Sequence, residues 1–98
     1  MRHVRFDVAT LAVEQVPVPL KVAYLLVAEQ EGFDRLQWEC LAYGLGDAPL
    51  AQGRYRVDIT TLEGRALSGA AILVRSVDGA HVLRGDGELS GVTTDDLS

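Results

Sequence analysis

A chain of 98 residues is the size of one globular domain, whose core is thin but sufficient for independent folding. Apolar residues make up 48% of the chain and charged residues 23%, which excludes a disordered protein. The net charge of −5 argues against nucleic acid and anionic membranes as the main partner.

The first predicted strand covers residues 3–15. Val4, Phe6 and Val8 alternate with polar side chains, a pattern typical of a strand with one buried face. Before Ala9-Thr10 the apolar residues stand at even positions, and after it Leu11 and Val13 stand at odd positions. We therefore expect a bulge or kink there. The two prolines that follow have no N–H to donate, so the strand ends before them.

Residues 19–44 allow two interpretations. The side chains from Leu36 onward alternate between apolar and polar, which favours strands near 19–29 and 35–43 joined by a loop at Glu31-Gly32-Phe33-Asp34. A proline near the first turn and a glycine near the end also fit a helical hairpin over the same residues. That alternative would make the fold α+β.

Three further strands are predicted near residues 54–62, 65–77 and 80–91. Two-residue turns at Glu63-Gly64 and Asp78-Gly79 would join them, and Asp-Gly is a preferred pair for a type I′ turn. Before them lies the one long connection, which is rich in glycine and is predicted to be a surface loop.

Two-residue turns would place Tyr55 opposite Ile72, and Val74 opposite Leu83. The predicted core face would then carry Tyr55, Val57, Ile59, Ile72, Val74 and Leu83. The opposite face would carry four arginines, Arg54, Arg56, Arg75 and Arg84, with Leu67 and Leu73 among them. Guanidinium groups suit carboxylates and phosphates, so this arginine face is a candidate partner surface, and a solvated sheet face is the alternative. A slip of one residue would exchange the two faces.

The residues that support catalysis or metal binding are sparse. Cys40 lies in an apolar row and is predicted to be a buried, inert thiol. His3 and His81 are far apart in the sequence, and no metal-binding spacing, nucleophile elbow or phosphate loop is present. We therefore predict no catalytic residue, no metal and no cofactor, and we favour a protein that is not an enzyme.

The strand near residues 19–29 is apolar on both faces, whereas a small antiparallel sheet usually leaves one face to water. A contact with another protein chain would explain why apolar side chains occupy both faces of this strand. The candidate self-association residues are Leu25, Val27, Leu41 and Tyr43. In the alternative, a small-ligand-binding barrel or enzyme, the candidate pocket residues are Tyr24, Trp38 and Tyr55.

We predict a single all-β domain over residues 1–92, with about six antiparallel strands in a meander that forms a barrel or two-layer sandwich. Residues 93–98 are polar and acidic, and a frayed tail is expected there. The expected function is a non-enzymatic interaction or assembly module that forms a homo-oligomer or binds a protein partner. One cysteine and the lack of a signal-peptide pattern favour a cytoplasmic protein. Eight arginines against one lysine suggest a GC-rich bacterial genome.

Overall fold

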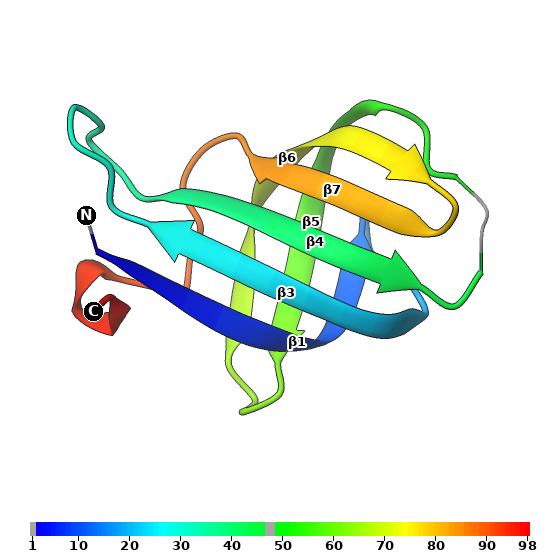
Figure 1. Ribbon diagram of the computed structural model, residues 1–98, viewed down its shortest axis with the longest axis horizontal. Coiled ribbons are helices and arrows are strands. Elements are labelled where there is room, and N and C mark those ends of the chain that lie inside the picture. Colours follow the sequence, from blue (N-terminus) through cyan, green and yellow to red (C-terminus); the bar gives the residue numbers. More distant parts are fainter. Residues whose placement is uncertain (1, 47–48) are drawn as a thin grey trace.

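The protein is a closed antiparallel β-barrel in the computed structural model, which describes residues 2–46 and 49–98. The elements are β1 (His3–Val13), β2 (Val16–Pro17), β3 (Leu20–Ala28), β4 (Gln37–Gly44), β5 (Gly53–Thr61), β6 (Ala66–Val77), β7 (Ala80–Gly85) and the 3-10 helix η1 (Thr94–Asp96). Strands β1, β3, β4, β7, β6 and β5 close the barrel in that order, and β2 is an extra strand on β1 (Figure 1).

The predicted all-β barrel is confirmed. The helical hairpin over residues 19–44 is excluded, because β3 and β4 occupy that segment. In the described part of the chain, no helix is long and apolar enough to cross a membrane.

The order of the strands departs from a simple meander at one connection. Strand β4 is followed by β5 in the chain, but its neighbours in the barrel are β3 and β7. Strand β5 lies instead between β6 and β1, and it crosses behind the front strands (Figure 1). The eight residues between β4 and β5 can span about 26 Å, so the chain is free to skip a neighbouring position. Strands β6 and β7 then bring it back to β4.

Strand β1 closes the barrel because a bulge lets it pair with two partners. Its first half, His3 to Asp7, pairs with β3, and its second half, Val8 to Val13, pairs with β5. The register shifts between Val8 and Thr10, which confirms the predicted bulge. A bulge bends its strand and increases the local twist, so β1 can pass from one side of the barrel to the other.

The turn between β5 and β6 has three residues, not the two that we predicted. The N–H of Thr61 donates to the carbonyl of Arg65 at 2.9 Å, and the N–H of Gly64 donates to the carbonyl of Thr61 at 2.9 Å. Gly64 has a φ of 94°, the left-handed conformation that this longer hairpin loop requires after a type I turn. Tyr55 therefore lies opposite Ala71 instead of Ile72.

This single extra residue exchanges the two faces of β6. Ile72 and Val74, predicted to be in the core, point outward and are 43% and 38% exposed. Leu67 and Leu73, predicted to be outside, are buried in the core. The predicted inward positions on β5 and β7 are unaffected, because Val57, Ile59 and Leu83 are all buried. The turn was misjudged because one residue more or less in a loop leaves the alternation of each strand unchanged.

The second predicted turn, at Asp78-Gly79, is confirmed. Both residues have positive φ, 53° and 82°, as a type I′ turn demands, and Val77 pairs with Ala80. A register shift between Leu73 and Arg75 then brings Leu73 opposite Leu83. The expected pairing of Val74 with Leu83 is therefore wrong by one position.

One end of the barrel is closed by Trp38 and by the chain that follows β7. Trp38 is buried, and its Nε1–H donates to the carbonyl of Gly87 at 3.0 Å. Strand β7 ends at Gly85 rather than near residue 91, and Leu89 and Val92 are buried beyond it. These side chains add to the core at this end.

Residues 93–98 are docked on the barrel rather than frayed. Leu97 is buried, and the backbones of His3 and Ser98 exchange two hydrogen bonds of 3.2 and 3.1 Å. Asp96 accepts from the N–H of Thr93 at 2.9 Å and pairs with Arg65 at 2.8 Å. The pKa of Asp96 is lowered mainly by the backbone hydrogen bond, with the Arg65 guanidinium second. Composition suggested fraying because one apolar residue among polar ones gives no periodic signal.

Candidate functional site

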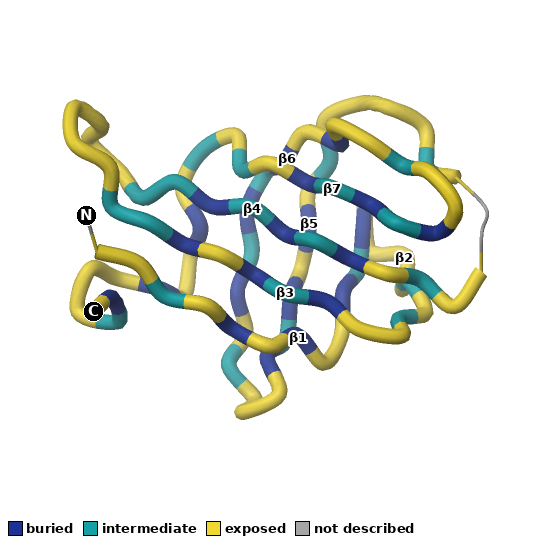
Figure 2. Tube along the Cα trace, viewed as in Figure 1, coloured by how far each residue is buried: buried dark blue, intermediate teal, exposed yellow. Residues whose placement is uncertain are grey.

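Strands β3, β4 and β7 carry apolar side chains on the outside of the barrel. Figure 2 shows buried and more accessible positions alternating along β3 and β4. The outward apolar side chains, which we call the outer apolar face, are Val22, Tyr24, Leu26, Leu41, Tyr43 and Val82. The strand pairings make the face continuous, since Tyr24 lies opposite Leu41 and Leu41 opposite Val82. Leu26 and Tyr43 are 41% and 43% exposed.

Charged residues of both signs border the outer apolar face. On β1, Arg5 lies opposite Leu26, and its guanidinium stacks 4.1 Å from the centroid of the Tyr24 ring. Asp7 lies opposite Tyr24 and pairs with Arg5 at 3.5 Å. At one end of the face, Glu39 of β4 lies between Leu26 of β3 and Arg84 of β7. Arg75 of β6 lies opposite Val82, so the border holds three arginines and two carboxylates, although the whole chain carries −5.

The predicted self-association residues divide between this face and the core. Tyr43 is exposed and Leu41 is half-buried, and both belong to the outer apolar face. Leu25 and Val27 are fully buried inside the barrel, so they cannot contact a partner of the folded protein. The choice of Leu25 and Val27 is corrected here. The sequence could not separate the two faces of this strand, because both are apolar.

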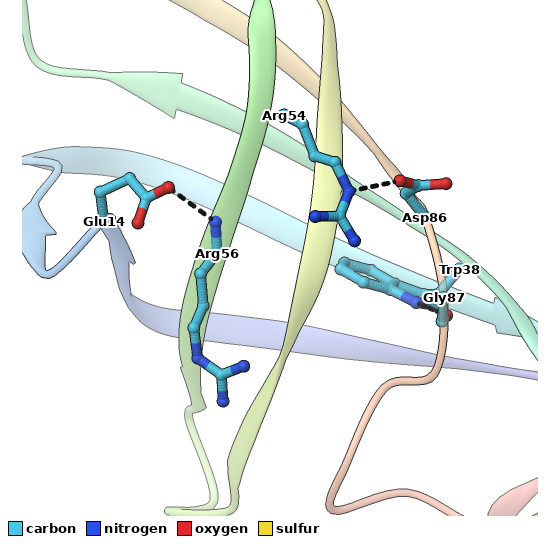
Figure 3. A network of polar contacts seen from close by, with 6 residues as sticks. All are labelled: Glu14, Trp38, Arg54, Arg56, Asp86 and Gly87. Atoms are coloured by element: carbon cyan, nitrogen blue, oxygen red, sulfur yellow. Dashed lines mark hydrogen bonds and ion pairs between the residues drawn. The ribbon is translucent and has the colours of Figure 1, made fainter.

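The four predicted arginines are all exposed, and Arg54 and Arg84 lie on either side of Ile72 in neighbouring strands. Arg54 pairs with Asp86 at 2.6 Å (Figure 3). Arg56 donates to the hydroxyl of Ser68 at 3.2 Å. Arg84 lies opposite Glu39, as described above. Arg75 lies past the register shift in β6, opposite Val82. Carboxylates thus accompany two of the four arginines, an arrangement that favours a solvated, charge-balanced surface over an anion site.

The three aromatic residues predicted to line one pocket lie in three different places. Tyr24 belongs to the outer apolar face, and Trp38 closes one end of the barrel. Tyr55 is half-buried near the opposite end, where its hydroxyl donates to the carbonyl of Ala51. A pocket formed by these three together is therefore absent from the described residues.

Tyr55 instead borders a cavity at the open end of the barrel, which we call the mouth cavity. Its volume is about 500 Å³, and it is lined by Val13, Glu14, Val16, Pro17, Val18, Pro19, Gly44, Gly46, Leu50, Tyr55 and His81. His81 is only 4% exposed, and its Nδ1 lies 2.8 Å from the hydroxyl oxygen of Ser76. Sequence reasoning missed this site, because its walls come from five separate segments. The available signal was a histidine in the apolar row of a predicted strand.

Cys40 lies at the centre of the barrel and is fully buried. Burial raises the pKa of its thiol from 9.0 to about 12, so the reactive thiolate is scarce. At pH 8 we expect a thiol reagent such as DTNB to label the native protein at least ~1000-fold more slowly than the urea-unfolded chain, since each pKa unit changes the thiolate fraction about tenfold. The measurement is absorbance at 412 nm over time. Fast labelling in native buffer would show that the barrel opens readily or that the thiol is accessible.

Comparison of the chain with protein-family models, with curated proteins and with solved structures finds no match. Within residues 2–46 and 49–98, no three histidine, cysteine, aspartate or glutamate side chains are grouped so that they could hold a metal ion. The outer apolar face and the mouth cavity are therefore the two candidate sites of this protein.

Proposed function

We propose that the protein is a non-enzymatic assembly module that pairs with a second copy of itself through the outer apolar face. The observation that carries the proposal is the continuity of this face over three adjacent strands. The outside of a small antiparallel barrel is ordinarily polar, and large apolar patches on soluble proteins mark contact surfaces. Here six apolar side chains occupy the positions where polar ones are expected.

The size of the face is compatible with a stable contact. A typical specific interface buries about 800 Å² on each partner, which is about one eighth of the 5972 Å² accessible surface of this chain. Strands β3, β4 and β7 are three of the six that form the barrel wall. Covering their outer side would bury the apolar centre and leave the charged border as a polar rim, as in known interfaces.

The charges around the face favour a second copy over a partner of one sign. A contact with two-fold symmetry sets each surface against itself, so it tolerates a border that contains both signs. Arg5 and Asp7 lie on one side of the face, and Glu39 and Arg84 lie at one end. A two-fold axis through the centre can place arginines of one copy near carboxylates of the other. A strongly basic partner would meet the arginines of this border, and a strongly acidic partner would meet its two carboxylates.

The test is the mass of the protein in solution as a function of concentration. By sedimentation equilibrium between 1 and 500 µM, we expect the wild-type chain to approach twice its mass of 10.6 kDa. Leu26→Glu places a charge on the outer apolar face beside Glu39, and we expect it to weaken self-association by about 100-fold or more.

Leu62→Glu is the matched control, because Leu62 is 71% exposed on the turn between β5 and β6 and lies on the opposite edge of β1 from β3. It introduces the same charge and should leave self-association unchanged. A wild-type chain that stays at 10.6 kDa at 500 µM would overturn the proposal. So would an equal loss of self-association in both variants.

A further inference from the structure

The two ends of the barrel are built differently. Trp38 and the chain after β7 fill one end, whereas the other end holds the mouth cavity of about 500 Å³. That volume lies within the range of small-molecule sites in proteins, about 300–1,000 Å³. Its walls are mostly apolar side chains, of which Val13, Val18 and Leu50 are examples. The outer apolar face lies on the side of the barrel, so this cavity is a separate feature.

The rim of the mouth cavity is held by backbone hydrogen bonds. The N–H of Gly44 donates to the carbonyl of Gly79 at 2.7 Å, and the N–H of Leu45 donates to the carbonyl of Pro19 at 3.0 Å. The N–H of Val18 donates to the carbonyl of Leu11 at 2.9 Å. Three different connections are thereby tied to one another around the opening. The cavity is preformed, which lowers the entropic cost of binding.

His81 presents a hydrogen-bond donor at this cavity. The N–H of Leu50 donates to the hydroxyl oxygen of Ser76 at 2.8 Å, and the same oxygen lies 2.8 Å from Nδ1 of His81. Of the two hydrogen-bond partners of Ser76 Oγ among the described residues, Leu50 N–H is a donor, so Nδ1 is the one that can accept the hydroxyl hydrogen. In the neutral ring, this arrangement assigns the proton to Nε2. Burial lowers the pKa of His81, so the ring is neutral at pH 7.

The remaining polar groups of the cavity narrow the ligand class. The hydroxyl hydrogen of Tyr55 is already donated to the carbonyl of Ala51, which leaves Nε2–H of His81 as the side-chain donor for a ligand. Among the cavity residues that the structure describes, Glu14 is the one charged side chain, and its carboxylate disfavours an anion. A cationic group placed at His81 would meet the Nε2–H donor, so the group that His81 binds is not a cation. An uncharged ligand fits both constraints.

The rim next to the cavity is also conformationally strained. Glu14 and Gln15 form the turn between β1 and β2 with φ values of 51° and 67°, a conformation preferred by glycine and asparagine. The turn is held by Arg56, whose carbonyl accepts from the N–H of Glu14 at 2.9 Å and whose N–H donates to its carboxylate at 3.3 Å (Figure 3). Strain of this kind is concentrated at ligand-binding and switch regions, which supports the assignment.

We infer that the mouth cavity binds a small uncharged molecule with an apolar body and one hydrogen-bond acceptor. The acceptor receives a hydrogen bond from the Nε2–H of His81. The apolar body packs against the valines and prolines of the rim, and the acceptor replaces the lost hydration of the buried imidazole. Ketones, esters, ethers and amides of modest size meet this description.

The experiment compares acetophenone, ethylbenzene and benzoate as probes of the ¹⁵N-labelled protein by NMR. Ethylbenzene keeps the phenyl ring and methyl group of acetophenone and lacks its carbonyl oxygen, and benzoate carries a charge. We expect acetophenone to cause saturable shifts at Val13, Val18 and Leu50 and at Nε2 of His81. Ethylbenzene should bind about fivefold more weakly, the effect of one net hydrogen bond, and benzoate more weakly still.

His81→Phe removes the donor and keeps an aromatic ring, so acetophenone and ethylbenzene should bind this variant equally. Leu62→Ala, on the turn between β5 and β6, should retain the wild-type preference. If His81→Phe does not fold, the His81 Nε2 shift of the wild-type protein decides, because only acetophenone should move it strongly. No saturable shift with acetophenone up to its solubility limit would overturn the site. Equal affinity of the wild-type protein for acetophenone and ethylbenzene would overturn the role of His81.

Discussion

Replacing Trp38 by alanine should lower the free energy of unfolding by about 3–5 kcal/mol, the range for large buried aromatic side chains. The indole closes one end of the barrel and is 4% exposed. A side chain at Gly85 would collide with the indole, and a Cβ at Gly69 would lie 3.0 Å from its Cζ2 atom, so the ring packs directly on backbone. Its removal would leave a cavity that these glycines cannot fill, and the carbonyl of Gly87 would lose its donor.

The measurement is urea unfolding followed by far-UV circular dichroism, since Trp38 is the one tryptophan and fluorescence is lost with it. Trp38→Phe serves as the control, because it keeps most of the ring volume and loses the hydrogen bond. We expect it to cost roughly 1–3 kcal/mol, less than the alanine variant. A loss below about 1 kcal/mol in Trp38→Ala would mean that the indole does not close the barrel.

Replacing Leu25 by alanine should lower the free energy of unfolding by about 2–5 kcal/mol. Leu25 is fully buried, and it lies on β3 opposite Phe6 of β1 and Cys40 of β4. Three neighbouring strands therefore share the packing that the substitution removes. The cost arises from the lost burial and from the cavity that remains between strands fixed by their hydrogen bonds.

Leu26→Ala is the matched control, since it alters the next residue on the opposite face of the same strand. In the monomer, measured at low micromolar concentration, we expect a change of about 0.5 kcal/mol or less. The comparison uses urea unfolding of both variants at the same concentration. Similar losses for Leu25→Ala and Leu26→Ala would contradict the assignment of the two faces of β3. The pair also separates packing in the core from self-association, which only Leu26 should affect.

The alternation of apolar and polar residues located the six barrel strands, although it did not predict β2 at the first of the two prolines. The period of two at Val4, Phe6 and Val8, and again from Leu36 to Cys40, follows from side chains that alternate between water and core. The Asp78-Gly79 turn was recognised because few other residues tolerate positive φ at both positions. These features are local, so they are encoded within a few neighbouring residues.

The candidate sites depended more on the tertiary structure than the strands did. Tyr43, Arg54, Arg56 and Arg84 were placed outside correctly by the parity of their strands. Arg75 is also outside, but only through the register shift after Leu73, because the predicted parity of β6 was wrong. Leu25 and Val27 were assigned to the wrong face, because β3 is apolar on both sides. The mouth cavity was not predicted, because it joins residues as distant as Val13, Leu50 and His81.

By itself, then, the sequence favoured an all-β chain over one with a helical hairpin at residues 19–44, and it located the six barrel strands and the bulge in β1. Only the tertiary structure decided the register of β6, the placement of β7 beside β4 and the closure of the barrel by β1 and β5. The physical reason is the same in each case. The pattern of a strand indicates that one of its faces is buried. A single additional residue in a turn changes which of its two faces points into the core. The choice of neighbour depends on side chains far away in the chain, which pack only once the barrel has closed.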